Sequence, residues 1–207
     1  MRSAARAVGP AALLVLALGA CSDEGTSITE QMRAGDQKGY VAGDGTIERL
    51  APGERSTTVS LSGTTLEDED WSLEDHRGDV VVINVWGAWC GPCTAEAPDL
   101  AAAATAFEEA GEPVTFIGVN DRDSIPSARA FEDKHDIPYP SLAYDGGRTL
   151  AQLGSLAPFR PTTLVVDAEG QLAARVGVQV DESTLTGMVQ DVLDDEAGAA
   201  DGEGAGG

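Results

Sequence analysis

Residues 80–98 read VVVINVWGAWCGPCTAEAP, and this stretch decides the fold. The apolar run at 80–86 has the length and β-branched content of a buried strand, whereas the Ala- and Glu-rich sequence at 94–110 has the composition of a helix. Cys90 and Cys93 stand between the two, where the strand passes into the helix. The stretch therefore predicts a β–α unit with a Cys-x-x-Cys motif at the start of its helix.

That position gives the two cysteines different chemical roles. Unpaired N–H groups and the positive end of the helix dipole stabilise a thiolate at the first cysteine, Cys90. Cys93 follows one helical turn later, close enough to form a disulfide and to act as the resolving thiol. We therefore predict that Cys90 and Cys93 are the catalytic pair of a thiol–disulfide exchange site.

Two other uses of this pair fit the sequence less well. A zinc site needs a second pair of ligands, but Cys21 is the only other cysteine, and His76 and His135 are isolated. A purely structural disulfide would close a very short loop and would constrain the unfolded chain little. We expect no metal ligands and no cofactor, and we expect His135 to end a helix rather than to act in catalysis.

The motif WCGPC, at 89–93, resembles the active-site motif of the thioredoxin superfamily. Asn84 and the Glu96-Ala97-Pro98 that follows the motif resemble the extracytoplasmic TlpA and ResA branch, a redoxin or AhpC/TSA-like domain. Residues 37–46 resemble the approach to the domain in CcsX-type lipoproteins. The resemblance implies an α/β, thioredoxin-like fold, with a central mixed sheet flanked by helices and an extra N-terminal β-hairpin. It also implies that Trp89 shields the disulfide and contacts substrates.

Glu96 matches the active-site glutamate of ResA-like proteins. The resemblance implies that this carboxyl group modulates the pKa values of the cysteines or shuttles a proton. A surface glutamate near the start of a helix, stabilised by the helix dipole, would leave the same residue at this position. Both interpretations stay open at this point.

A second informative stretch is Arg160-Pro161-Thr162-Thr163, which leads into an apolar run. It resembles the cis-proline segment of thioredoxin-like proteins, which lies beside the Cys-x-x-Cys motif and accepts the substrate backbone. A cis X–Pro bond is rare enough to indicate a specific use, and a trans proline that opens a strand is the alternative. Arg160 departs from the small or β-branched residue of the branch, and we expect it to face the substrate and to add positive charge near Cys90.

The N-terminal sequence predicts export and anchoring. Residues 1–20 combine basic residues with an apolar run too short to span a bilayer comfortably. Their end, Leu18-Gly19-Ala20-Cys21, resembles the bacterial lipobox, which implies a lipid on Cys21 and a domain tethered at the outer face of the cytoplasmic membrane. An ordinary secretory signal with an incidental cysteine is the alternative. Residues 21–55 are rich in Gly, Asp, Glu, Ser and Thr, and we expect a flexible tether there.

The remaining chain predicts a single domain at 56–193 and a disordered acidic tail at 194–207. A β-hairpin is expected at 57–73, with its turn at 62–64. The β-α-β order beyond it predicts a parallel sheet covered by helices. We expect further strands at 113–120, 137–142, 162–167 and 172–178, and further helices at 124–135, 147–155 and 181–193.

The acidic balance of the chain excludes two classes of partner. Its 207 residues hold 13 Lys and Arg against 35 Asp and Glu, for a net charge of −22, and no basic residue follows Arg175. Such a surface does not suit nucleic acid or anionic lipid. We attribute the charge to solubility.

The function predicted from the resemblance is reduction of the Cys-x-x-Cys-His motif of apocytochrome c before haem attachment. Electrons would come from a membrane protein of the CcdA or DsbD type, and we expect a tethered monomer. Whether the protein reduces or oxidises its substrate depends on its reduction potential. A DsbE-like oxidase or isomerase of secreted proteins is therefore the alternative. A peroxiredoxin is disfavoured because Gly87, and not Thr or Ser, lies three residues before Cys90. A non-enzymatic binding module is disfavoured because Pro161 accompanies an intact Cys-x-x-Cys motif.

Overall fold

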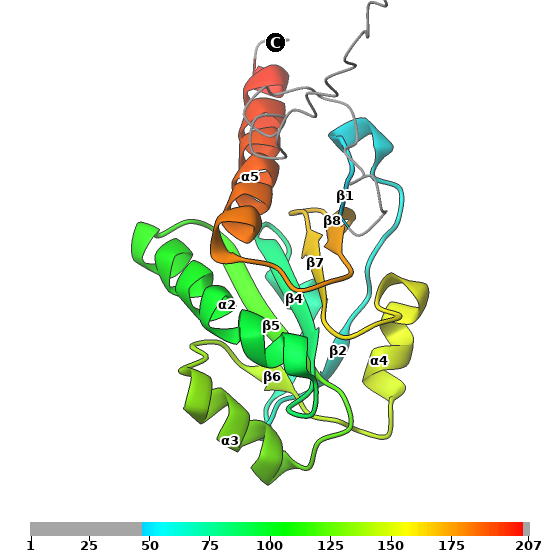
Figure 1. Cartoon of the computed structure of the whole chain (residues 1–207). Helices are drawn as coiled ribbons and strands as arrows, with labels where there is room; N and C mark the ends of the chain where they lie inside the picture. The colour runs from blue at the N-terminus through cyan, green and yellow to red at the C-terminus, as the bar shows by residue number, and fades with distance from the viewer. Residues whose placement is uncertain (1–46, 205–207) are drawn as a thin grey trace, which may run out of the picture. The chain divides into compact units, whose positions relative to one another are not determined.

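The predicted central strand lies in the middle of a six-stranded mixed sheet with the order β1-β8-β7-β4-β5-β6 (Figure 1). The computed structural model describes residues 47–204, with side chains through Ala199. Neighbours β4, β5 and β6 are parallel, whereas β7 runs antiparallel to β4 and to β8, and β1 runs antiparallel to β8. The predicted mixed sheet is confirmed.

The elements follow the predicted order through most of this range. The strands are β1 (Ile47–Arg49), β2 (Ser62–Thr64), β3 (Asp70–Ser72), β4 (Val80–Trp86), β5 (Val114–Asn120), β6 (Ser141–Leu142), β7 (Thr162–Val166) and β8 (Leu172–Val176). The helices are α2 (Gly91–Ala110), α3 (Ile125–His135), α4 (Arg148–Leu153) and α5 (Glu182–Gly204), with short 3-10 turns η1 (Pro52–Glu54), η2 (Leu73–His76) and η3 (Gly154–Leu156). His135 ends α3, as expected.

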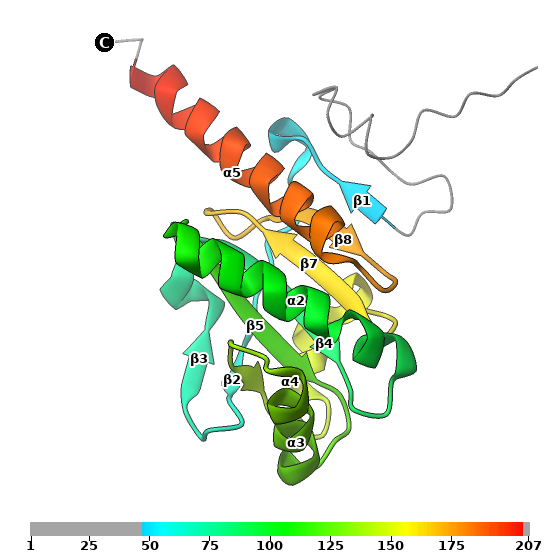
Figure 2. The same ribbon diagram turned by 60° about the vertical axis from the view of Figure 1, so that its left-hand side comes forward.

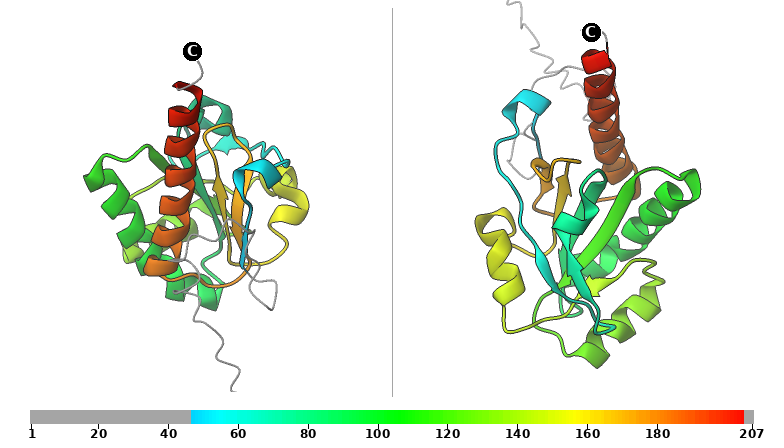
Figure 3. Two further views of the ribbon diagram at one scale, coloured as in Figure 1. Left: turned by 90° about the horizontal axis from the view of Figure 1, so that it is seen from above. Right: turned by 180° about the vertical axis from the view of Figure 1, so that it is seen from behind.

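The two faces of the sheet are covered by different elements. Helices α2 and α5 lie across one face, and α4 and the segment before β2 lie on the other (Figures 2 and 3). Side chains alternate along a strand, so successive residues of β4 point to opposite faces. The face beneath α4 holds a core of aliphatic side chains, among them Val59, Leu61, Val81, Ile83, Val85, Ile117, Leu153 and Leu164.

The N-terminal hairpin forms, but its turn lies elsewhere than predicted. Residues 62–64, expected to turn, form β2 and pair with β3, and the chain reverses at 65–69. The Thr65 hydroxyl accepts the N–H groups of Glu67 and Glu69, at 3.2 Å each, and this local bonding stabilises the turn. The earlier segment, 57–61, pairs with the β7–β8 turn, with Thr58 opposite Gln171, and packs Val59 and Leu61 into the core. Its backbone bond to the hairpin is from the N–H of Leu73, directly after β3, to the Leu61 carbonyl.

The domain begins earlier than the predicted boundary at residue 56. Strand β1 pairs with β8, with Ile47 opposite Val176, so part of the expected tether is the sheet edge. The prediction failed there because three residues carry too weak a pattern to indicate a strand. The predicted signal peptide, the remainder of the expected tether and Cys21 lie outside the described residues.

The domain also ends later than predicted, because α5 continues through Gly204. The expected disorder from Asp194 onward is therefore wrong for 194–204. Two arginines near β1 explain the difference: Arg49 pairs with Asp191 and Asp195, each at 3.3 Å, and Arg55 pairs with Glu196 at 3.3 Å. These long-range ion pairs hold an acidic helix end whose composition alone indicates disorder. Within residues 47–204, no helix has the length and apolar character needed to cross a membrane.

Candidate active site

The two predicted cysteines form a disulfide at the point where β4 passes into α2. Their sulfurs are bonded and their Cα atoms are 5.3 Å apart. Cys90 is the N-cap of α2, and its Sγ accepts a hydrogen bond from the backbone N–H of Cys93 at 3.2 Å. This is the contact that stabilises a thiolate on Cys90 after reduction. The predicted disulfide and its place at a helix N-terminus are confirmed, and the catalytic role of the pair stays a prediction.

Glu96 is fully buried on the next turn of α2, so the interpretation of a surface glutamate is wrong. One carboxylate oxygen accepts from Asn84 Nδ2 at 2.9 Å, and the other accepts from the backbone N–H of Val180 at 3.1 Å. Asn84 also donates to the Thr163 hydroxyl at 3.2 Å. The carboxyl group thus joins α2 to β4, to β7 through Asn84, and to the loop before α5.

Burial raises the pKa of Glu96 from 4.5 to about 7, against the opposing effect of the hydrogen bonds from Asn84 and Val180. A carboxyl group that titrates near neutrality, three residues after Cys93, is suited to accept or donate a proton during thiol exchange. The geometry is therefore compatible with the proton-transfer role implied by the resemblance.

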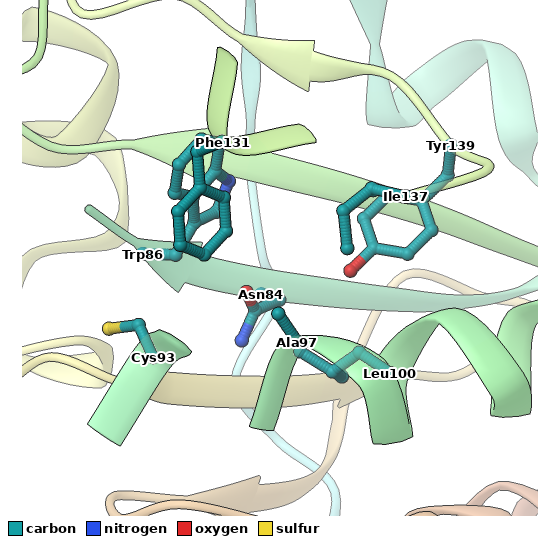
Figure 4. Close-up of a pocket in the computed structure, with 8 residues that line it drawn as sticks. All are labelled: Asn84, Trp86, Cys93, Ala97, Leu100, Phe131, Ile137 and Tyr139. Carbon is teal, nitrogen blue, oxygen red and sulfur yellow. The ribbon is translucent and has the colours of Figure 1, made fainter. Parts of the chain in front are cut away.

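A small cavity lies beside Cys93, between β4, α2, α3 and the segment before β6 (Figure 4). Its volume of about 10 Å³ is close to the lower limit for one water molecule. The hydroxyl of Tyr139 points toward Asn84 across this space (Figure 4). Burial raises the pKa of that phenol, and the charges of Glu96 and Glu132 raise it further. The lining residues are Asn84, Trp86, Cys93, Ala97, Leu100, Phe131, Ile137 and Tyr139.

Trp89 is half exposed, at 51%, next to the buried Cys90. Its indole Nε1–H donates to the backbone carbonyl of Asp121 at 2.7 Å, and the Arg122 guanidinium lies 4.4 Å from its ring centroid. A Cβ at Gly87 would lie 2.5 Å from that indole nitrogen, so only glycine leaves room for the folded-back ring. The predicted role of Trp89, shielding the disulfide and contacting substrates, stays a prediction.

The bond between Arg160 and Pro161 is cis, as predicted. Thr162 pairs with Val85 in the β4–β7 register, which places Pro161 at the end of β4 from which Cys90 follows. The side chain of Arg160 departs from expectation. It is folded back against Asp121, with Nε 3.1 Å from Oδ2, and its charge is paired there instead of facing a substrate. The reason is Asp121 itself, a buried carboxylate at the end of β5.

A second carboxyl group with a raised pKa, that of the partly buried Glu132 on α3, was not predicted. Desolvation raises the pKa of Glu132 from 4.5 to about 7, against the opposing effect of the nearby Ser141 side chain. Ser141 also accepts from Trp86 Nε1 at 3.1 Å, and Trp86 stacks on Phe131 with ring centroids 4.5 Å apart. Glutamates are common on helix surfaces, and α3 has no sequence feature that marks this one as partly desolvated.

Three carboxylates within the described residues have donor atoms close enough together, within 4.8 Å, to share a cation: Asp167, Glu169 and Glu196. Arg55 already pairs with Asp167 at 3.4 Å and with Glu196 at 3.3 Å, so a cationic group occupies this place. The cluster belongs to the β7–β8 turn and the end of α5. It makes no contribution to the disulfide site.

Comparison with known families identifies the domain. A model of the family described as AhpC/TSA matches residues 52–175. Among curated proteins, the thiol-disulfide oxidoreductase ResA of Bacillus cereus is 27% identical over 129 residues, covering 62% of this chain and 72% of its own. The thiol:disulfide interchange protein HelX of Rhodobacter capsulatus is 29% identical over 149 residues, covering 72% of this chain and 79% of its own.

Solved structures agree with this assignment. A DsbF homologue from Corynebacterium diphtheriae superimposes with a TM-score of 0.65 at 32% identity, covering 73% of this chain and 96% of that protein. A secreted thiol-disulfide isomerase from Corynebacterium glutamicum gives a TM-score of 0.68 at 28% identity, covering 76% and 98%. The resemblance to thioredoxin-like oxidoreductases is therefore confirmed.

Proposed function

Because this chain belongs to the AhpC/TSA family and is a thiol–disulfide oxidoreductase, we propose that it reduces protein disulfides outside the cytoplasmic membrane. The observation that carries this proposal is the arrangement of Cys90, Cys93 and Glu96 along the first turns of α2. The first cysteine receives an N–H hydrogen bond, the second is 1% exposed, and the buried carboxyl group follows one turn later.

The exchange proceeds in two steps on this geometry. The Cys90 thiolate attacks one sulfur of the substrate disulfide, so that this bond breaks, a mixed disulfide forms and the other substrate sulfur leaves as a thiolate that takes up a proton. The Cys93 thiol then loses its proton, for which the Glu96 carboxylate is the nearby acceptor by sequence position on α2. The Cys93 thiolate attacks Cys90 Sγ and releases the second substrate thiol. Two electrons pass to the substrate, and the Cys90–Cys93 disulfide remains.

The substrate class we propose is the oxidised Cys-x-x-Cys-His motif of apocytochrome c. The support is the resemblance to the ResA branch at Asn84 and Glu96, together with the family relatives found above. A membrane protein of the CcdA or DsbD type would reduce the Cys90–Cys93 disulfide again. We further propose anchoring through a lipid on Cys21 at the extracytoplasmic face, a residue that lies outside the described range.

A second candidate is oxidation or isomerisation of secreted proteins. Its support is that solved structures similar to this one include a DsbF homologue and a secreted thiol-disulfide isomerase. The same residues would act, with electrons passing from a substrate dithiol to the protein disulfide. The Gly91-Pro92 dipeptide favours the reductant, because thioredoxin shares it and has a potential of roughly −270 mV.

The deciding experiment is the reduction potential of the Cys90–Cys93 pair, measured at equilibrium with a glutathione buffer. We expect a value below about −240 mV, and a value above about −180 mV would replace the reductase with the oxidase. Substrate class is tested separately, with an oxidised Cys-x-x-Cys-His peptide and a control peptide in which the histidine is replaced by alanine. Preference for the histidine peptide supports apocytochrome c, and equal rates would remove that assignment.

A further inference from the structure

Asp121 lies between the two segments that flank the disulfide. It follows β5, which runs parallel to β4, so the two strands end at the same edge of the sheet, with Trp86 opposite Asn120. The backbone N–H of Asp121 donates to the Trp86 carbonyl at 2.8 Å, and the residue is only 6% exposed. Its carboxylate and its carbonyl are thus held at the end of the sheet from which the Cys90 loop departs.

The carboxylate contacts the first of these segments, the turn before Pro161, through Arg160. The ion pair from Arg160 Nε to Asp121 Oδ2 is 3.1 Å long. The same guanidinium donates through Nη1 to the carbonyls of Ala157 and Phe159, both at 2.8 Å. One side chain therefore holds the whole turn and attaches it to Asp121.

The second segment is the loop carrying Trp89, which is bound by the backbone of Asp121. The Asp121 carbonyl accepts from the Trp89 indole at 2.7 Å. The other carboxylate oxygen, Oδ1, pairs with Arg122 Nε at 3.2 Å, and Arg122 covers the Trp89 ring. Asp121 thus contacts the residue before Cys90 directly and the turn before Pro161 through one arginine.

The two arginines differ in how strongly they depend on Asp121. In the Asp121–Arg160 pair the side chains are 8% and 14% exposed, so removal of either partner leaves a poorly solvated charge. Arg122 is 61% exposed and its ion pair contributes little. The buried pair is therefore the contact on which the geometry of this edge depends.

We propose that Asp121 is a positioning residue for the oxidoreductase, which sets the Pro161 turn and Trp89 at a fixed separation on either side of Cys90. It does not touch the reacting sulfurs and acts through Arg160 and Trp89. An extended protein segment contacts both sides of Cys90 during exchange, whereas a small disulfide needs the sulfur alone. Loss of the ion pair therefore slows exchange with protein disulfides much more than exchange with glutathione disulfide. The proposal rests on the oxidoreductase activity but not on its physiological direction.

The test compares Asp121→Asn, Arg160→Gln, the double variant and Arg160→Lys, with Glu48→Gln as the control. The control breaks another partly buried ion pair, Glu48 with Arg175 at 3.0 Å, on β1 and β8. Each reduced protein is assayed with insulin and with glutathione disulfide. For insulin we expect the second-order rate constant of disulfide exchange to fall at least tenfold in both single variants, and for glutathione disulfide by no more than twofold.

Non-additivity and rescue complete the test. The double variant should be no slower with insulin than the slower single variant, because one contact is lost in each case. Arg160→Lys keeps the positive charge, so its exchange with insulin should be at least threefold faster than that of Arg160→Gln. Equal losses on both disulfides, multiplicative losses in the double variant, or losses no larger than in Glu48→Gln would overturn the proposal. Thermal unfolding of each variant measures its stability. If the loss of insulin exchange only tracks the loss of stability, the proposal is also overturned.

Discussion

The two faces of β4 have opposite characters, although both are buried. Val81, Ile83 and Val85 point into a core of hydrophobic side chains beneath α4. On the α2 face the same strand presents Asn84, bonded to Glu96 and lying beside the cavity at Cys93. The first face can contribute only packing and apolar burial. The second contains the groups that can move protons and electrons.

Glu96 shows what the chemistry on the active-site face costs in stability. A buried carboxyl group with a pKa of about 7 is disfavoured in its charged form, and the hydrogen bonds to Asn84 and Val180 offset only part of that cost. The aliphatic face carries no comparable cost. Substitutions on the two faces should therefore separate stability from redox chemistry.

Ile83→Ala, on the aliphatic face, should have the largest effect on stability. Ile83 is fully buried, and its truncation leaves a cavity in a packed core. We expect the free energy of unfolding to fall by about 4 kcal/mol, measured by chemical denaturation. The equilibrium constant with glutathione should stay within twofold of the wild type, and a larger change would contradict the separation of the two faces.

Glu96→Gln should change how stability depends on pH. Below pH 4.5 the glutamate is protonated in both states, but between pH 4.5 and about 7 the unfolded chain ionises first. Wild-type stability therefore falls as pH rises through this window, by roughly 3 kcal/mol from this group. The glutamine side chain cannot ionise, so the denaturation midpoint of Glu96→Gln should fall less steeply as pH rises than that of the wild type. Glu132, which has a similar pKa, remains in both proteins and cancels in the difference. Parallel curves would show that Glu96 does not titrate in this window.

Gly118→Ala tests the packing next to Trp86 on the active-site side. An added Cβ would lie 2.0 Å from Ser141 Oγ and 2.7 Å from Trp86 Nε1, so these groups must shift. We expect a loss of about 2 kcal/mol in thermal or chemical unfolding. Gly53→Ala, where a Cβ meets nothing within 4 Å, is the control and should leave stability nearly unchanged.

Ser141→Ala should have the smallest effect. The substitution removes the acceptor of the buried Trp86 indole N–H, bonded at 3.1 Å, and leaves that donor unpaired. The expected cost is about 1 kcal/mol in the free energy of unfolding. Thr105→Ala, which removes a hydroxyl bonded only to a carbonyl of its own helix, should cost less. An equal cost for the two would mean that the indole finds another partner.

Local sequence patterns were sufficient for the elements that carry the chemistry. The strand at 80–86 and the helix after Cys90 follow from a hydrophobic run and a helix-forming composition, whose signal lies within a few positions of the chain. The cysteine pair and the cis-proline lie in short motifs that resemble those of a known family. These features needed no knowledge of what packs against them.

The features that were missed depend on distant partners. Strand β1 exists because Ile47 meets Val176, and the end of α5 is held because Arg49 and Arg55 reach it from the other terminus. The direction of Arg160 was mistaken because Asp121 lies 39 positions earlier in the chain. No window of local sequence contains both members of such a pair.

The sequence by itself determined the reactive pair, its helix N-terminus and the proline segment beside it, because these are set by local backbone geometry and residue chemistry. Only the tertiary structure decided that Glu96 is buried with a raised pKa, that Arg160 is paired with Asp121, and where the domain begins and ends. Burial and ion pairing are properties of groups brought together by folding, and their energies depend on the environment that the whole fold creates.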